Sequence, residues 1–346
     1  MRETLFDVDD SSRLDDRRIH RVIFETLDRH LPEIVFIPGW SARAALAALR
    51  WCLARRRPSV VMSETTRWDH PRIAWREMVK RGLAQLFSAG LVGGAPHRDY
   101  LAELGMPQRA IALGYDVVDN PYFSVGASAA RARGDELRGR LGLPGRYFLA
   151  SGRFVPVKNL AGLLEAFARF RSLRPESSTA LVLLGDGEGR AALEARRDAL
   201  GLKGIVLTPG FKQYSELPAY YGLADAFVHV SRVEPWGLVV NEAMAAGLPI
   251  VVSRQCGCAS TLLREGENGF CVSFDSLEEI AARLAQLDAD AALRERMGAR
   301  SREIIADWGP ARFAAGALEA ARLAAERGAA TDRLVARGLL SALRGA

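Results

Sequence analysis

The sequence predicts an α/β protein with two lobes, each built on a parallel sheet. Its 346 residues, 49% of them hydrophobic, are enough for two domains of ordinary size. Short apolar runs alternate with amphipathic helical segments along the chain. Because each expected strand is followed by a helix before the next strand begins, the strands of each lobe should pair in parallel, with helices covering the sheets.

The expected elements divide the chain into a first lobe over residues 1–125, a second lobe over 136–305 and a C-terminal part over 306–346. The segment 124–135, rich in Ala, Gly and Arg, is expected to connect the lobes. In the first lobe we expect a helix at 44–54 and strands at 34–38, 59–63 and 91–92. In the second lobe and the C-terminal part we expect helices at 277–287 and 311–326, and strands that begin near residues 147, 180, 204, 226, 249 and 269.

Two carboxylates, Glu234 and Glu242, flank an expected helix start in EPWGLVVNEAMAAGLPIV. The helix should cover 238–246 and stop at Gly247 and Pro249, so Glu234 precedes its first turn and Glu242 lies about one turn inside it. A helix N-terminus presents unpaired N–H groups and the positive end of a dipole, which suit a phosphate. The carboxylates could then accept hydrogen bonds from sugar hydroxyls. A helix with one acid at its start and another in solvent would give the same pattern.

A second group of candidate residues, Gly152, Arg153 and Lys158, lies between a short apolar strand at 147–150 and a helix that starts near Leu160. Ligands of open α/β sheets bind beyond the carboxyl ends of the strands, where this loop should lie. Arg offers a bidentate fork and Lys a mobile point charge, a combination that suits a diphosphate without a metal. Either cation alone would more often be a solvated surface charge.

Several motifs follow one another in order between Gly93 and Phe313. They are GYDVVDNPYF (114–123), SGRFVPVKNL (151–160), LLGDGEGR (183–190), PGF (209–211), EPWGLVVNEAMAAGLPIV (234–251) and GENGFCV (266–272). In their order and spacing the chain resembles the retaining glycosyltransferases of family 4, which have the GT-B fold. That resemblance implies two Rossmann-like lobes with parallel sheets, the first on the acceptor side, and a last helix within 306–346 that crosses back to the first lobe before the basic tail. It also implies a nucleotide-diphosphate sugar as donor, with no metal or other cofactor.

The resemblance also implies roles for the candidate residues. Arg153 and Lys158 would hold the donor's diphosphate and, together with Glu234, act in catalysis. Glu242 would bind the ribose hydroxyls, and Glu234 the transferred sugar. The implied donor-binding set is Gly152, Gly210, Phe211, Trp236, Gly237, Leu238 and Glu242. By the same resemblance, the leaving phosphate would assist deprotonation of the acceptor on the front face of the sugar, with retention at the anomeric carbon.

The first lobe departs from the family pattern in two places. Family members usually open with a strand and a glycine-rich loop, and MRETLFDVDDSSRLDD has neither, so we expect this lobe to be incomplete. Many members also carry a histidine after a strand of this lobe, near the donor sugar. In the corresponding loop, SETTRWDHPR, Glu64 is nearest to that place and His70 follows six residues later. Either could contact a sugar hydroxyl; Asp69 and His70 could equally cap the helix after Pro71.

Charge and cysteine content argue against several classes of protein. The net charge is +6, but the 47 basic residues are spread along the chain and balanced by 41 acids, without a basic and aromatic platform for nucleic acid. The sequence Cys256-Gly257-Cys258 lacks a second Cys or His pair to complete a metal site, and His229 is expected on an apolar strand. No apolar run approaches the ~20 residues of a membrane span, and the acidic start is no signal peptide. We therefore expect a cytoplasmic protein.

Residues 72–87 could form an amphipathic helix on an anionic membrane surface. Its basic side chains would be Arg72, Arg76, Lys80 and Arg81, and its apolar face would comprise Trp75, Met78, Val79, Leu83, Leu86 and Phe87. The preferred alternative is a surface helix whose apolar face covers the sheet of the first lobe. The basic segment 333–346 leaves the same two alternatives open.

Together these features predict a glycosyltransferase that acts on a sugar or glycolipid acceptor in cell-envelope polysaccharide or glycolipid synthesis, at the inner face of the membrane. One alternative is a noncatalytic subunit that binds a nucleotide sugar. Another is a different GT-B enzyme, such as a sugar-nucleotide epimerase or a phosphorylase. A Rossmann dehydrogenase is disfavoured, because GDGEGR at 185–190 only partly matches G-x-G-x-x-G and is better interpreted as a turn into a helix at 191–200.

Overall fold

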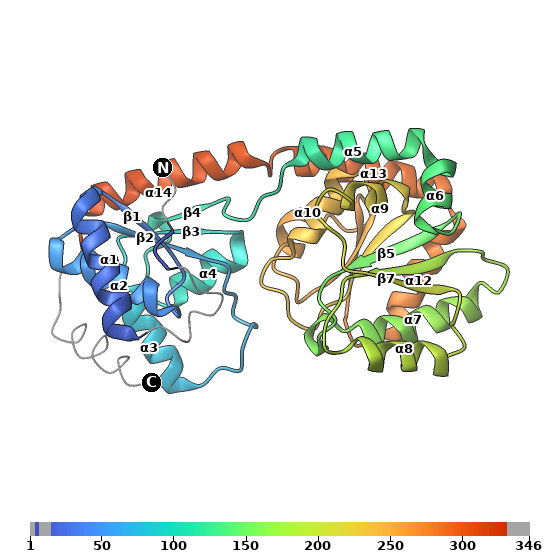
Figure 1. Ribbon diagram of the computed structural model, residues 1–346, viewed down its shortest axis with the longest axis horizontal. Coiled ribbons are helices and arrows are strands. Elements are labelled where there is room, and N and C mark those ends of the chain that lie inside the picture. The colour runs from blue at the N-terminus through green and yellow to red at the C-terminus, as the bar shows by residue number, and fades with distance from the viewer. Residues whose placement is uncertain (1–3, 7–14, 331–346) are drawn as a thin grey trace. The chain divides into compact units, whose positions relative to one another are not determined.

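The computed structural model describes residues 4–6 and 15–330, which fall into two compact units (Figure 1). The first unit comprises Met1–Tyr115 and Phe313–Ala346, and the second comprises Asp116–Arg312. Each unit contains one parallel sheet with helices on both faces. The basic segment 333–346 and most of the acidic start lie outside the described residues.

The first unit has a four-stranded sheet in the order β1-β2-β3-β4, with every neighbouring pair parallel. Its elements are α1 (Asp16–His30), β1 (Val35–Pro38), α2 (Arg43–Arg55), β2 (Ser59–Ser63), α3 (Ala74–Ala84), β3 (Ala89–Val92), α4 (Ala95–Glu103), β4 (Ile111–Leu113) and most of α14 (Pro310–Arg327). On one face Val61 packs in a cluster with α2 and α4, and on the other Val60 packs in a cluster with Ala320 of α14. A Cβ on Gly316 would come within 2.3 Å of the Leu113 carbonyl oxygen, so α14 can lie this close to β4 only with glycine there.

The second unit contains six strands and most of the remaining helices. Its elements are α5 (Asn120–Ala132), α6 (Gly134–Leu141), β5 (Tyr147–Ser151), α7 (Leu160–Leu173), β6 (Ala180–Leu184), α8 (Arg190–Ala199), β7 (Val206–Gly210), α9 (Leu217–Leu223), β8 (Ala226–His229), α10 (Leu238–Ala245), β9 (Ile250–Ser253), α11 (Ala259–Leu262), β10 (Gly269–Val272), α12 (Leu277–Ala289) and α13 (Ala291–Ala306). Its strands are largely buried on both faces, as expected for a covered parallel sheet.

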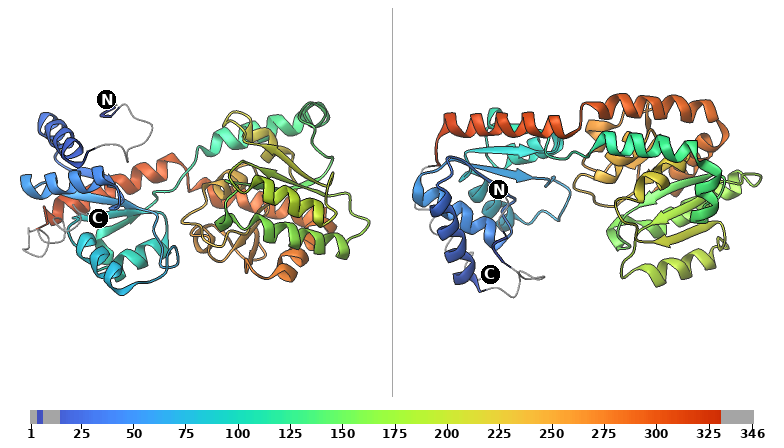
Figure 2. Two further views of the ribbon diagram at one scale, coloured as in Figure 1. Left: turned by 60° about the horizontal axis from the view of Figure 1, so that its bottom comes forward. Right: turned by 45° about the horizontal axis from the view of Figure 1, so that its top comes forward.

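The sheet of the second unit is parallel throughout, in the order β10-β9-β8-β5-β6-β7. One core cluster contains residues of α7, α8 and α12, and the other contains residues of α5, α9 and α10 (Figures 1 and 2). The neighbouring strands β5 and β8 are therefore followed by helices on opposite faces, α7 and α10. Such a switch in strand order opens a crevice at the carboxyl ends of the two strands, which is where ligands of these sheets bind.

Most expected strands are confirmed with small shifts in their bounds. The prediction that residues 124–135 connect the two lobes is wrong. Residues 124–135 form the greater part of α5 and the start of α6, and they belong to the second unit. Their small side chains serve close packing instead of flexibility. A Cβ on Gly126 would lie 2.6 Å from the Cβ of Pro218, so this glycine lets α5 approach α9.

Within residues 4–6 and 15–330, no helix combines the length and the apolar composition that crossing a membrane requires.

Candidate functional site

Lys158 and Glu234 meet at the point where the strand order of the second sheet reverses. Lys158 ends a 3₁₀ turn, Pro156–Lys158, between β5 and α7, and Glu234 lies in the loop between β8 and α10. The Lys158 ammonium contacts Oε2 of Glu234, and the two side chains are only 19% and 10% exposed. The structure thus brings together two of the predicted residues, from the two loops that border the crevice.

The turn that carries Lys158 is anchored to the loop that carries Glu234. The side-chain amide of Asn159 donates to the carbonyl oxygens of Val230 at 3.2 Å and of Phe274 at 2.8 Å. The backbone N–H of Arg232 donates to the carbonyl oxygen of Val157 at 2.8 Å. These bonds fix the turn that carries Lys158 against the loop that carries Glu234.

Glu234 is an ionised carboxylate in a nearly buried place. Burial would raise its pKa, but the hydrogen bond and charge of His229, and then the charge of Lys158, outweigh that effect and lower the pKa to about 2. Nε2 of His229 lies 2.8 Å from Oε2 of Glu234 and 3.2 Å from Oγ of Ser231. At neutral pH this carboxylate can accept hydrogen bonds, but it has no proton to donate as a general acid.

The turn before α10 is tightly packed around Gly237. This residue has φ +100°, and a Cβ on it would lie 2.9 Å from Sγ of Cys256 and 3.3 Å from Cγ of Glu234. The preceding Trp236 is buried, and its indole N–H donates to Oδ1 of Asn241 at 3.0 Å. The helix starts at Leu238, as predicted, and its first-turn N–H groups lie next to the Glu234 loop.

Glu242 lies one turn inside α10, again as predicted, and accepts a hydrogen bond of 2.7 Å from the hydroxyl of Tyr221. Burial raises the pKa of Glu242 to about 7, against the lowering effect of the Tyr221 hydrogen bond. The ring of Tyr221 is fully buried on α9. The two glutamates therefore have opposite pKa shifts, one held ionised by cations and one held partly neutral by an apolar environment.

The loop after β5 packs against the loop after β6. The N–H of Phe154 donates to the Asp186 carbonyl oxygen at 2.8 Å, and a Cβ on Gly185 would come within 2.0 Å of the carbonyl oxygen of Gly152. The GDGEGR segment therefore is a turn into α8, as interpreted, and its first glycine permits this close approach. Between these loops Arg153 is exposed.

The remaining donor candidates lie at the ends of β7 and α10. Gly210 ends β7 with φ +89°, and its carbonyl oxygen accepts from the N–H of Gly185 at 3.1 Å. Phe211 is 67% exposed and Leu238 is 42% exposed, so both side chains can contact a ligand.

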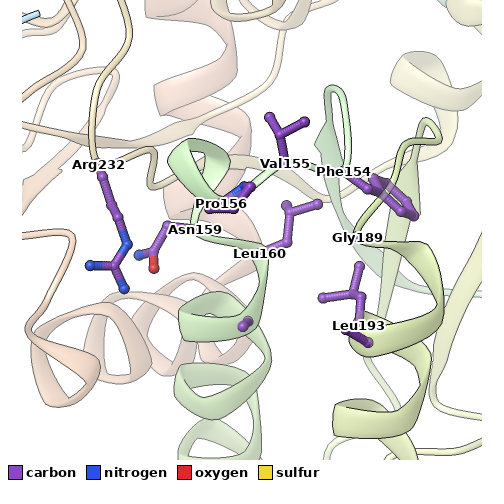
Figure 3. Close-up of a pocket in the computed structure, with 10 residues that line it drawn as sticks. Phe154, Val155, Pro156, Asn159, Leu160, Gly189, Leu193 and Arg232 are labelled. Carbon is purple, nitrogen blue, oxygen red and sulfur yellow. The ribbon is translucent and has the colours of Figure 1, made fainter.

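A cavity of about 510 Å³ lies beside the Lys158 turn (Figure 3). Phe154, Leu160 and Leu193 give it a mainly apolar lining, and Asn159 and Arg232 lie at its other side. The amide of Asn159 is already used to anchor the turn. Neither Lys158 nor Glu234 is among the residues that line this cavity.

Two candidate sugar contacts, Glu64 and His70, belong to the first unit, and both side chains are exposed. Glu64 directly follows β2. The alternative that Asp69 and His70 cap the next helix is wrong, because Ile73 is the residue at that cap. Asp69 instead closes its own loop, accepting from the backbone N–H of Thr66 at 2.7 Å.

The predicted amphipathic face over residues 72–87 is divided in the structure. Leu83 and Phe87 are buried in the core of the first unit, whereas Trp75 is 60% exposed and Met78 is 68% exposed. The guanidinium of Arg76 lies over the Trp75 ring, 5.4 Å from its centroid. The C-terminal part of this segment therefore packs on the core of the first unit, as the preferred alternative predicts. Its N-terminal part presents apolar side chains at the surface.

His229 and Tyr221 are the residues of this site that sequence reasoning missed. Each hydrogen-bonds one of the two glutamates, yet neither belongs to a motif that was assigned a role. For His229 a signal was available, since it is the polar side chain of an otherwise apolar strand, Ala226–His229. For Tyr221 the sequence offers no such signal, because its hydrogen bond to Glu242 depends on how α9 packs near α10.

Comparison with known proteins places this site in a family. Residues 135–304 match the model of the family described as "Glycosyl transferases group 1". A lipopolysaccharide core biosynthesis glycosyltransferase of Rhizobium meliloti is 35% identical over 157 residues, 45% of this chain and 44% of that protein. An alpha-monoglucosyldiacylglycerol synthase of Acholeplasma laidlawii is 31% identical over 153 residues, 44% of this chain and 37% of that protein. These matches span less than half the length of the curated relatives.

A solved structure extends the likeness to the whole fold. An Anabaena protein crystallised with UDP-glucose superposes with a TM-score of 0.70 over 89% of this chain and 81% of that chain, at 21% identity. Both parallel sheets are thus accounted for by one known architecture, the GT-B fold. Residues 135–304, which make up most of the second unit, therefore form a domain of the glycosyl transferases group 1 family, and the fold of the chain is GT-B.

Proposed function

We propose that this protein transfers a sugar from a nucleoside-diphosphate sugar to a hydroxyl acceptor, with retention at the anomeric carbon. The observation that carries the proposal is the contact of Lys158 with Glu234 at the switch point of the second sheet. A cation for the diphosphate and a carboxylate for sugar hydroxyls lie side by side there, next to a helix N-terminus that suits a phosphate.

Each group of the site has a part in donor binding. The ammonium of Lys158 has three donors, so it can contact Glu234 and a phosphate oxygen together. Arg153, exposed at the same loop, adds a bidentate partner for the diphosphate. Glu242 accepts from the ribose hydroxyls, and the backbone of Trp236, Gly237 and Leu238 faces the sugar and its phosphate.

The proposed chemistry consists of charge stabilisation and positioning. As the bond from the anomeric carbon to the phosphate oxygen breaks, negative charge grows on the diphosphate, where Lys158, Arg153 and the N-terminus of α10 offset it. The acceptor oxygen bonds to the anomeric carbon from the same face, and its proton passes to the leaving phosphate oxygen. A pair of carboxylates acting as acid and nucleophile is disfavoured, because Oε2 of Glu234 is already engaged by Lys158 and His229.

The experiment is turnover in the Lys158→Ala variant, with release of nucleoside diphosphate and the anomeric form of the product as readouts. The exposed Lys203 supplies the matched control, Lys203→Ala. The proposal expects Lys158→Ala to fold and lose turnover by at least about a hundredfold, as removal of one transition-state donor typically does. Unchanged turnover would contradict it. Donor binding by the wild type without transfer or hydrolysis would instead identify a noncatalytic binding subunit.

For the acceptor we propose a glycolipid or envelope polysaccharide, with the enzyme at the inner face of the membrane. Support comes from the relatives named for lipopolysaccharide core and glucosyldiacylglycerol synthesis and from the exposed Trp75 and Met78 of α3. Aromatic and apolar side chains beside arginine suit an anionic lipid surface. Sedimentation with vesicles that contain anionic lipid should fall in Trp75→Ser/Met78→Ser and persist in Leu318→Ser, an exposed leucine of α14. Equal sedimentation of all three proteins would contradict this surface.

A further inference from the structure

His229 is a buried polar side chain at the end of an apolar strand. It is 5% exposed, and the other residues of β8 (Ala226, Phe227 and Val228) are fully buried. The imidazole stacks at 6.1 Å on the ring of Phe227. A buried imidazole without a partner would destabilise the fold, and Nε2 of His229 has two partners, Oε2 of Glu234 at 2.8 Å and Oγ of Ser231 at 3.2 Å.

The contact constrains one oxygen of Glu234. His229 and Lys158 both reach Oε2, and a carboxylate oxygen offers about two acceptor positions. The terminal torsion of a glutamate is otherwise broad, so two donors on one oxygen limit its rotation. Oε1 is then the oxygen available to accept a hydrogen bond from a ligand.

The two donors to Oε2, Lys158 and His229, differ in how far they can move when a ligand binds. In the proposed donor site Lys158 is shared with the diphosphate, and its flexible side chain can move toward it. His229 is held in the strand, and a Cβ on Gly237 would lie 3.7 Å from its Nε2, which places the turn directly against the ring. The imidazole therefore can keep Oε2 in place while the ammonium adjusts.

We propose that His229 is a positioning residue for the donor's sugar, holding Oε2 of Glu234 so that Oε1 accepts from a hydroxyl of the transferred sugar. This inference rests on the proposed function of the site. Its consequence is selective, since loss of the imidazole should weaken recognition of the sugar and leave recognition of the nucleoside diphosphate, which depends on Arg153, Lys158 and Glu242.

The test compares dissociation constants for UDP-glucose and UDP, and for GDP-mannose and GDP, in three variants. His229→Leu removes the N–H donor and puts an apolar side chain of similar bulk in its place. His229→Gln keeps an N–H donor at nearly the same reach. His229→Asn has the same amide as His229→Gln on a side chain one methylene shorter, so the amide should not reach Glu234. This variant tests the loss of the donor with a polar residue if His229→Leu fails to fold.

We expect His229→Leu and His229→Asn to bind the nucleotide sugar about tenfold or more weakly, the loss expected when a buried acceptor loses its donor, with binding of the diphosphate within about twofold. His229→Gln should restore sugar binding. Equal weakening of both ligands, or none, would overturn the positioning role while leaving the proposed function intact. A wild type that binds no UDP-, GDP-, ADP- or TDP-sugar would overturn the proposed function and this inference with it.

Discussion

The side chains of Lys158 and Glu234 are in contact although 76 positions separate them in the sequence. They belong to loops that follow neighbouring parallel strands, β5 and β8, whose next helices cover opposite faces of the sheet. The topology itself therefore brings a cation and an anion together where such sheets bind ligands. The proposed donor offers a diphosphate for the cation and sugar hydroxyls for the carboxylate.

Glu234 should make the protein sensitive to acid. Its pKa in the fold is about 2 against an ordinary value of 4.5, so its ionisation stabilises the folded state above pH 4.5 and that contribution is lost as the pH falls toward 2. The difference in unfolding free energy between wild type and Glu234→Gln should therefore shrink between pH 5 and 3, by about 2 kcal/mol. Chemical denaturation across this range measures it. A constant difference would contradict the ion-paired carboxylate.

Glu242 should act in the opposite direction. Its pKa in the fold is about 7, so the folded state binds the proton more tightly than the unfolded chain, and stability falls as the pH rises from 4.5 through 7. Glu242→Gln can still accept from Tyr221 and avoids a buried charge. It should gain stability relative to wild type by up to about 3 kcal/mol between pH 4.5 and 7.5. Glu295→Gln, at an exposed glutamate of α13, is the control; a parallel pH profile for all three proteins would refute the assignment.

Gly237→Ala should destabilise the turn before α10 far more than an ordinary glycine substitution. The residue has φ +100°, and the new Cβ would lie 2.9 Å from Sγ of Cys256. Strain and overpacking together should lower the unfolding free energy by about 2–5 kcal/mol. Gly142→Ala isolates the backbone term, because Gly142 has φ +63° with nothing within 4 Å of a Cβ. Thermal denaturation of the two variants measures the difference, and equal costs would show that packing at Gly237 is unimportant.

Removing the Cys256 side chain should partly rescue the stability of Gly237→Ala. In a Cys256→Ala background the Sγ atom that meets the new Cβ is gone, so Gly237→Ala should cost less there than in the wild type. A double-mutant cycle gives the coupling directly. Independent, additive effects of the two substitutions would mean that another contact dominates this turn.

The strands of the second unit could be predicted because they are buried on both faces. In β6 every residue is buried, so the strand reads as an unbroken apolar run. Helix α1 was not among the expected elements, since it is polar overall and only Ile19 of its 15 residues is buried. The strand β4 has three residues, too few for a pattern. The prediction of a connecting segment at 124–135 is wrong because glycine and alanine are found in closely packed helices as well as in flexible segments.

The glutamates and Lys158 of the site could be predicted because loops at strand ends carry them in ordered motifs. Their partners could not. Tyr221 lies 21 positions before Glu242 on another helix, and its hydrogen bond depends on tertiary packing. The opposite pKa shifts of Glu234 and Glu242 follow from these partners and from burial, so they too required the structure.

We propose above that the second unit binds a nucleoside-diphosphate sugar through Glu242, Lys158 and Glu234. Thermal unfolding of the purified protein with UDP-, GDP-, ADP- and TDP-sugars tests it most directly, because a ligand that binds only the folded state raises stability by RT ln(1 + [L]/Kd). We expect a rise in Tm with one donor, which is lost in Glu242→Ala and kept in Glu295→Ala. No rise with any donor, or a rise that Glu242→Ala leaves unchanged, would contradict it.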